Sequence, residues 1–229
     1  HLGLPIDAAR AVEVLAQENI VDCDYCSVND IPFFCTFGIG FDAVVSDSFA
    51  HQSRRGRFMY VKSVVDHLRN FTPEEYEIEI DGNNTLKGKA FIIACCNASQ
   101  YGNNAYIAPT ADITDGLLDI TIVHAGSPLN TALAGVDLFT GYIDRSTIIQ
   151  TFKTTKAILH RNKAGLAHID GEPIILPEDL TVKCHHQSLK LIVPPHIEPF
   201  RPIYTPINSA WQDFKISLVN WLKRGNKML

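Results

Sequence analysis

Short apolar runs separated by turn residues dominate the chain, and the pattern is most regular between residues 147 and 193. Apolar segments of strand length recur there between turn residues, as is typical of a β-sandwich or barrel. The predicted strands of this region are 148–160, 164–169, 173–176, 180–185 and 189–193. We therefore predict an α+β, mainly β fold: an antiparallel β-sandwich-like domain with a few peripheral helices and a C-terminal helix.

Further strands are predicted nearer the N-terminus. Residues 76–80 alternate apolar and acidic side chains, the pattern of a half-exposed strand. They are followed by Asp81-Gly82-Asn83-Asn84, which is a strong hairpin sequence. The other predicted strands cover residues 20–29, 32–39, 85–96 and 117–123.

Helical patterns are confined to a few segments. Asp7 is placed to cap a helix over residues 8–19. Prolines between residues 194 and 206 exclude a helix there, and an amphipathic helix follows them. The predicted division is a β-rich domain at 1–206 and a C-terminal amphipathic helix at 207–229. The other predicted helices cover residues 41–50, 57–71 and 127–140.

One polar loop, residues 97–119, lies between two predicted buried strands, where binding sites are often built. It contains three carboxylates, Asp112, Asp115 and Asp119, and hard cations prefer oxygen ligands. The loop is therefore either a cation site or an acidic surface turn, and residue types alone do not decide between the two.

Asp170 and Glu172 form a second acidic pair, with Gly171 between them and Pro173 after them. On an extended backbone, residues two apart project to the same side. Two neighbouring carboxylates raise each other's proton affinity, which brings one of them closer to a useful general base. The alternative is a hairpin tip with solvated acids.

Composition restricts the partners. The 229-residue chain has a net charge of −5 and no basic block, which argues against nucleic acid. No apolar run approaches the roughly 20 residues that span a bilayer, and no signal peptide is recognised, so we expect a cytoplasmic protein with reduced cysteines.

A zinc site built on Cys23, Cys26 and Cys184 is disfavoured, because residues three apart on a strand face opposite sides.

Four motifs stand out along the chain: His1-Leu2-Gly3-Leu4-Pro5, Phe37-Gly38-Ile39-Gly40-Phe41-Asp42-Ala43, the loop from Asn97 to Asp119 with Asp115-Gly116-Leu117-Leu118-Asp119, and His168-Ile169-Asp170-Gly171-Glu172-Pro173. In their order and approximate spacing they resemble the diacylglycerol kinase-like lipid kinases, the bacterial group in particular. The resemblance covers about Leu2 to Pro195 and places the chain in the C-terminal half of such an enzyme. The family's Gly-Gly-Asp-Gly-Thr phosphate-binding loop is absent, and the chain begins with His1. We therefore expect a fragment whose nucleotide-binding domain has been removed, which alone cannot hold ATP.

The resemblance implies an ATP-dependent transferase of phospholipid metabolism that phosphorylates the hydroxyl of diacylglycerol or a similar lipid. It implies Glu172 as the general base, with Asp170 in support or as a phosphate-side metal group. It also implies a structural Mg²⁺ held by the carboxylate of Asp115 and the backbone carbonyls of Asp112 and Leu117. The family has an apolar residue where Asp112 stands, which does not interfere if only its backbone binds.

Several alternatives stay open. Asn97 is either a contact to substrate or nucleotide or a buried amide that satisfies loop backbone groups. A related two-domain kinase could act on a sphingosine-type lipid or on NAD, whereas a non-catalytic lipid-binding module would not need Glu172. A Ca²⁺- or carbohydrate-binding β-sandwich is suggested only by the loop at residues 97–119, called the acidic loop below. Homodimerisation and peripheral attachment to a membrane are both compatible with the sequence.

Overall fold

The structure is a computed structural model that describes residues 2–5, 7–51, 67–68, 71–82, 84–102, 105–127, 130–131, 134, 137, 141, 143 and 146–195. The chain divides into two compact units, residues 1–199 and 200–229, and all described residues belong to the first. Most of the predicted helices over 57–71 and 127–140, and the whole predicted C-terminal helix, lie outside the described residues.

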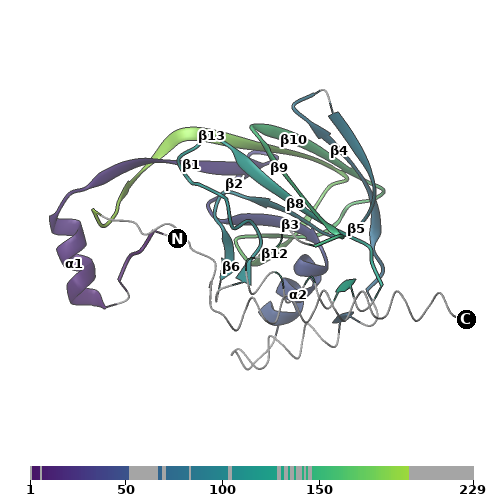
Figure 1. The fold of residues 1–229 in the computed structure, drawn as a ribbon, viewed down its shortest axis with the longest axis horizontal. Coiled ribbons are helices and arrows are strands. Elements are labelled where there is room, and N and C mark those ends of the chain that lie inside the picture. Colours follow the sequence, from purple (N-terminus) through teal and green to yellow (C-terminus); the bar gives the residue numbers. More distant parts are fainter. Residues whose placement is uncertain are drawn as a thin grey trace, which may run out of the picture. The chain divides into compact units, whose positions relative to one another are not determined.

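One antiparallel sheet of 11 strands forms most of the described structure, beside a small second hairpin. Its strands are β1 Ile20–Val28, β2 Ile31–Phe33, β3 Thr36–Gly40, β4 Glu74–Ile80, β5 Asn84–Cys96, β8 Leu118–His124, β9 Ile149–Thr154, β10 Lys156–Arg161, β11 Gly165–Ile169, β12 Glu172–Leu176 and β13 Asp179–Ile192. Their order is β12-β11-β3-β5-β4-β10-β13-β1-β2, with β8 paired to β5 and β9. The curled sheet in Figure 1 confirms the predicted mainly β, antiparallel architecture.

The main core gathers buried side chains from strands that are far apart in the sequence, including Phe33 of β2, Ile78 of β4 and Leu180 of β13. The alternation predicted for β4 is observed, because Tyr76, Ile78 and Ile80 are buried while the glutamates between them are not. Burying one such large apolar side chain contributes about 1.5–3 kcal/mol to folding.

Two helices flank the sheet in the described part of the chain. Helix α1 spans Ala8–Ala16, and the carboxylate of Asp7 accepts a hydrogen bond from the amide of Arg10 at 3.0 Å, which confirms the predicted cap. Helix α2 spans Phe41–Ala50 and contacts β3, β5, β11 and β12. A second apolar cluster forms at α2, where Phe41 stacks on Phe91 of β5 with ring centroids 4.6 Å apart.

Gly40 is required at the junction of β3 and α2. Its φ is +100°, and a Cβ atom there would lie 2.6 Å from the carbonyl oxygen of Phe91. Any other residue would be both strained and too close to β5. The short turn from β3 into α2 therefore depends on glycine.

Three predicted strand boundaries are wrong. The predicted strand 32–39 is broken into β2 and β3 at Phe34 and Cys35, and the predicted strand 148–160 is broken into β9 and β10 at Thr155. Conversely, the two strands predicted over 180–193 are the single strand β13. That strand continues through polar residues because it is hydrogen-bonded to β1 on one side and, over part of its length, to β10 on the other.

Candidate functional site

The Asp170-Gly171-Glu172 segment is a tight turn between β11 and β12. Asp170 and Gly171 have φ values of +49° and +88°, and Ile169 pairs directly with Glu172 across the hairpin. The expectation that Asp170 and Glu172 project to the same side of an extended backbone is therefore wrong. Two left-handed residues reverse the chain between the two carboxylates.

The carboxylate of Asp170 holds the loop between β2 and β3. It accepts hydrogen bonds from the backbone amides of Phe34, Cys35 and Thr36 at 2.9, 2.8 and 2.9 Å, and both of its oxygens take part. The amide of Asp170 in turn donates to the carbonyl of Thr36 at 2.8 Å. These contacts explain the break between β2 and β3 and give Asp170 a structural role. Its proposed role at a metal stays a prediction.

Glu172 presents an exposed carboxylate next to this anchored turn. Alternation along β12 puts Glu172 on the same face as Ile174 and Leu176, which pack against the main core. Glu172 therefore stands where the core-facing side of β12 meets the solvent. No described residue donates a hydrogen bond to its carboxylate.

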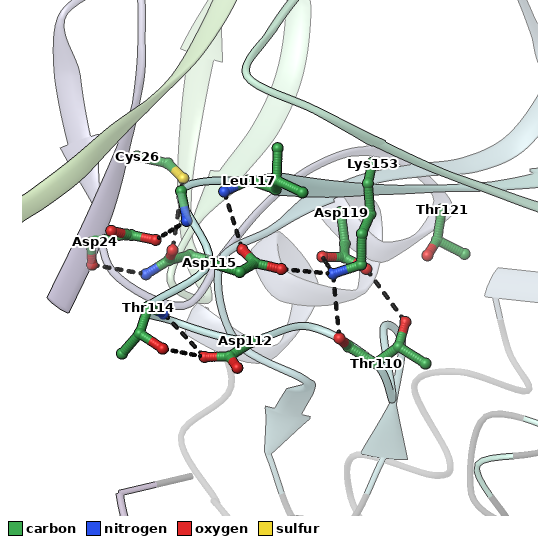
Figure 2. Close-up of polar contacts among 12 residues, drawn as sticks. Asp24, Cys26, Thr110, Asp112, Thr114, Asp115, Leu117, Asp119, Thr121 and Lys153 are labelled. Carbon is green, nitrogen blue, oxygen red and sulfur yellow. Dashed lines mark hydrogen bonds and ion pairs between the residues drawn. The ribbon is translucent and has the colours of Figure 1, made fainter.

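The acidic loop is built around the ammonium of Lys153 on β9 (Figure 2). The Nζ atom of Lys153 lies 2.9 Å from Asp115 Oδ2, 2.9 Å from Asp119 Oδ2 and 3.2 Å from the carbonyl oxygen of Thr110. Burial raises the pKa of Asp119 even though Lys153 acts in the opposite direction. Burial also lowers the pKa of Lys153, but its hydrogen bonds with Asp119 and Asp115 outweigh this and leave that pKa raised. Lys153 thus supplies one positive charge of the protein itself against Asp115 and Asp119.

The carboxylates of Asp115 and Asp112 are both engaged in other contacts in this arrangement. Asp115 Oδ1 accepts from the amide of Leu117 at 2.9 Å, and its other oxygen binds Lys153. Asp112 Oδ1 is bonded to the amide and hydroxyl of Thr114 at 2.9 and 2.7 Å. Within the described residues no three His, Cys, Asp or Glu side chains form a metal-binding group. The arrangement does not fit the ion while Lys153 is in place, so magnesium at Asp115 stays a prediction.

A buried carboxylate that the sequence did not single out anchors the same loop. The side chain of Asp24 on β1 has 0% exposure. It accepts from the amides of Gly116 and Gln187, both at 2.7 Å, and lies 2.9 Å from Nδ1 of His186. Because Gly116 and His186 are distant in the sequence, no local pattern could have identified this cluster.

Asn97 is buried directly after β5. Its side-chain amide donates to the carbonyls of Asp24 and Phe34, each at 3.0 Å. This geometry favours the structural role that the sequence left open for Asn97. A contact with substrate or nucleotide stays a prediction.

A second buried polar cluster joins α2 to the turn that carries Glu172. Nε2 of His168 lies 3.1 Å from Oδ2 of Asp42, and the two side chains are only 2% and 9% exposed. The hydroxyl of Tyr101 donates to the same oxygen at 2.7 Å. Asp42 and His168 both lie inside motifs that carry the family resemblance, and that signal could have identified them.

Other features lie apart from the loop and the turn. A pocket of about 370 Å³ is lined by residues of β4, β5 and β10 and by Asn162. Cys23 and Cys26 pack in separate apolar clusters. Within the described residues, no helix is long and apolar enough to cross a membrane.

The sequence that forms these sites matches a known protein family. The family model described as the YegS C-terminal NAD kinase beta sandwich-like domain matches residues 36–193. The chain belongs to this family. The matched range of the YegS C-terminal family contains both the acidic loop and the Asp170–Glu172 turn, and it confirms the resemblance read from the sequence.

Named relatives agree with this family. The Probable lipid kinase YegS of Salmonella newport is 27% identical over 175 residues, covering 75% of this chain and 57% of the relative. A diacylglycerol kinase of Mycobacterium tuberculosis is 32% identical over 90 residues, covering 38% of this chain and 29% of the relative. This chain of the YegS C-terminal family therefore spans well under two thirds of either relative.

A solved structure supports the fold. The crystal structure of a diacylglycerol kinase from Bacillus anthracis matches with a TM-score of 0.60 at 17% identity, covering 85% of this chain and 61% of that chain. At this identity the likeness shows the fold alone. It agrees with the antiparallel, sandwich-like sheet of the YegS C-terminal family.

Proposed function

We propose that this chain is the lipid-substrate domain of an ATP-dependent lipid kinase that phosphorylates the hydroxyl of diacylglycerol or a similar lipid at a membrane surface. The observation that carries the proposal is the family match over residues 36–193, which contains both acidic motifs. The names of the Salmonella and Mycobacterium relatives supply the reaction class.

In this proposal Glu172 is the general base. Its carboxylate accepts the proton of the lipid hydroxyl while the hydroxyl oxygen attacks the γ-phosphorus of ATP, and the bond to the ADP oxygen breaks. Two features support Glu172. Its carboxylate is exposed, and Asp170 anchors the adjoining turn through three backbone amides. A base held in a defined position loses less conformational freedom when it acts.

ATP and the Mg²⁺ that accompanies it are proposed to bind mainly outside this chain, in the part of the relatives that the chain does not span. Phosphoryl transfer needs charge neutralisation at the phosphates, and the ammonium of Lys153 is already paired with Asp115 and Asp119. A structural Mg²⁺ at Asp115 would have to displace Lys153. Homodimerisation stays a prediction.

The test is ATP-dependent phosphorylation of diacylglycerol in mixed micelles by the intact protein. Glu172→Gln should lower the rate by roughly 10²-fold or more, as loss of a general base predicts. Glu178→Gln is the matched control, because Glu178 is also an exposed glutamate near the same hairpin, and it should leave the rate unchanged. Equal, measurable rates for the parent and Glu172→Gln would remove Glu172 as the base. No phosphorylation of any acceptor by the parent, together with binding to lipid vesicles, would favour a non-catalytic lipid-binding module.

A second candidate is phosphorylation of NAD, because the matched family is described as NAD kinase beta sandwich-like. The same assay with NAD and with a sphingosine-type lipid in place of diacylglycerol separates these substrates. Activity with either one, and none with diacylglycerol, would keep the kinase reaction and replace its acceptor.

A further inference from the structure

The buried cluster of Asp42 and His168 contacts the turn that carries Glu172, and the proposed reaction does not use it. Burying a carboxylate and an imidazole together is costly unless each is hydrogen-bonded, and here Asp42 Oδ2 accepts from Tyr101 and contacts His168. Gly38 makes room for the pair. A Cβ atom there would overlap Oδ2 of Asp42 and lie 2.5 Å from Nε2 of His168.

The geometry assigns the hydrogen on the His168 ring. Nε2 faces a carboxylate oxygen at 3.1 Å, so it carries the hydrogen and donates. In a neutral imidazole the other nitrogen, Nδ1, is then an acceptor. The amide of Gly171 lies 3.4 Å from Nδ1, at the long end of the hydrogen-bonding range, and donates to it. Asp42 thus selects the tautomer that lets His168 accept from the turn.

The turn is consequently held on both sides. Asp170 ties it to the amides of the loop between β2 and β3, and His168 accepts from the amide of Gly171. Gly171 has a φ of +88°, and a glycine can adopt many other backbone conformations as well. A fixed acceptor for its amide restricts those alternatives immediately before Glu172.

We propose that Asp42 and His168 are positioning residues that orient the Asp170–Glu172 turn, so that the Glu172 carboxylate is held where it receives the substrate proton. The inference rests on the proposed function of Glu172. Tyr101, which is in strand β6 (Gln100–Gly102) of the small hairpin after β5, bonds to Asp42 and so joins that hairpin to the turn. The two motifs of the resemblance that contain Asp42 and His168 are thereby in direct contact.

Two replacements of His168 distinguish its contact with Asp42 from its hydrogen bond with the amide of Gly171. His168→Gln places an amide group near the position of Nε2, which keeps a donor for Asp42 and removes the acceptor for Gly171. His168→Asn places an amide group near the position of Nδ1, which keeps the acceptor and removes the contact with Asp42. His160→Gln is the control, because His160 is a partly exposed histidine on β10.

The intact protein is assayed in mixed micelles, and amide hydrogen exchange is measured at the turn. We expect His168→Gln to lower kcat on the order of tenfold or more, as misplacement of a catalytic group does, with KM for ATP and lipid within about twofold. Exchange at Gly171 should accelerate in His168→Gln and much less in His168→Asn. The control should change neither quantity.

Three outcomes would overturn the inference: unchanged exchange at Gly171 in His168→Gln, equal losses of kcat in both His168 variants, or a normal kcat in His168→Gln while Glu172→Gln is inactive. If Glu172→Gln matches the parent, the proposed function fails instead, and the exchange measurement still tests whether His168 orders the turn. If His168→Gln does not fold, Asp42→Asn replaces it. An amide group that donates to Nε2 moves the ring hydrogen to Nδ1, which removes the acceptor for Gly171, so the same acceleration of exchange at Gly171 is expected.

Discussion

Replacing Asp24 by alanine should destabilise the protein more than any other single change at an acidic residue of β1. The Asp24 carboxylate is fully buried and accepts from two backbone amides, those of Gly116 and Gln187, each at 2.7 Å. Alanine would leave both amides without their acceptor. It would also leave Nδ1 of His186 without its partner.

The expected loss follows from these contacts. A hydrogen bond to a charged group contributes about 1.5–3 kcal/mol, so two of them give roughly 3–6 kcal/mol. His186 is half exposed at 52%, so water replaces its lost contact and adds little. Domains of this kind are stable by about 5–15 kcal/mol, and the Asp24→Ala variant should therefore lose a large share of its stability.

Urea unfolding followed by circular dichroism measures this loss. Asp22→Asn is the matched control, because Asp22 lies two residues earlier on β1 and its contact is an exposed ion pair with Lys190 at 2.6 Å. Exposed ion pairs contribute about 0–1 kcal/mol. If the free energies of unfolding of the two variants are within about 0.5 kcal/mol of each other, the usual spread for surface substitutions, the argument that Asp24 anchors the acidic loop is refuted.

Other changes should have distinct results. Gly38→Ala should cost more than 2 kcal/mol in urea unfolding, because strain from overpacking the Asp42 site costs about 1–3 kcal/mol and a buried polar contact is lost as well. Lys153→Met should cost about 1 kcal/mol after solvent screening is allowed for, and should make the melting temperature rise on addition of Mg²⁺. Because the pKa of Lys153 is raised above 10.5, its stabilisation is complete below pH 10.5, so the difference between wild type and Lys153→Met should shrink above that pH. Arg161→Lys should cost about 2 kcal/mol in thermal unfolding, because one ammonium cannot bond to the four backbone carbonyls that the guanidinium reaches at the base of the β11–β12 hairpin.

Both acidic motifs depend on a carboxylate with a structural task. Asp24 fixes the loop that contains Asp115, and Asp170 fixes the loop between β2 and β3 beside Glu172. An acidic residue in a motif is therefore not automatically a catalytic or metal-binding group. Among the acids of the described loop and turn, Glu172 is the one whose carboxylate is exposed and free of a hydrogen bond from a described residue.

The features of the fold that could be predicted from the sequence alone are those set by residues close together in the chain. The cap at Asp7, the start and end of α2, the alternation in β4 and the hairpin at residues 81–84 all depend on residues a few positions apart. Hydrophobic period and turn chemistry act over such distances. The order of the four motifs also predicted the family correctly, because it is a property of the sequence itself.

Tertiary structure decided the rest, because the interactions involved join residues that are distant in the chain. The break between β2 and β3 is set by Asp170, about 135 positions away from the amides that it binds. Lys153 lies 38 positions from Asp115, so its ion pairs with the acidic loop cannot be seen in that loop's own sequence. The pairing of Asp42 with His168 spans 126 positions. Local propensity carries no information about such pairs, since they form only when the curled sheet brings the ends of its strands together.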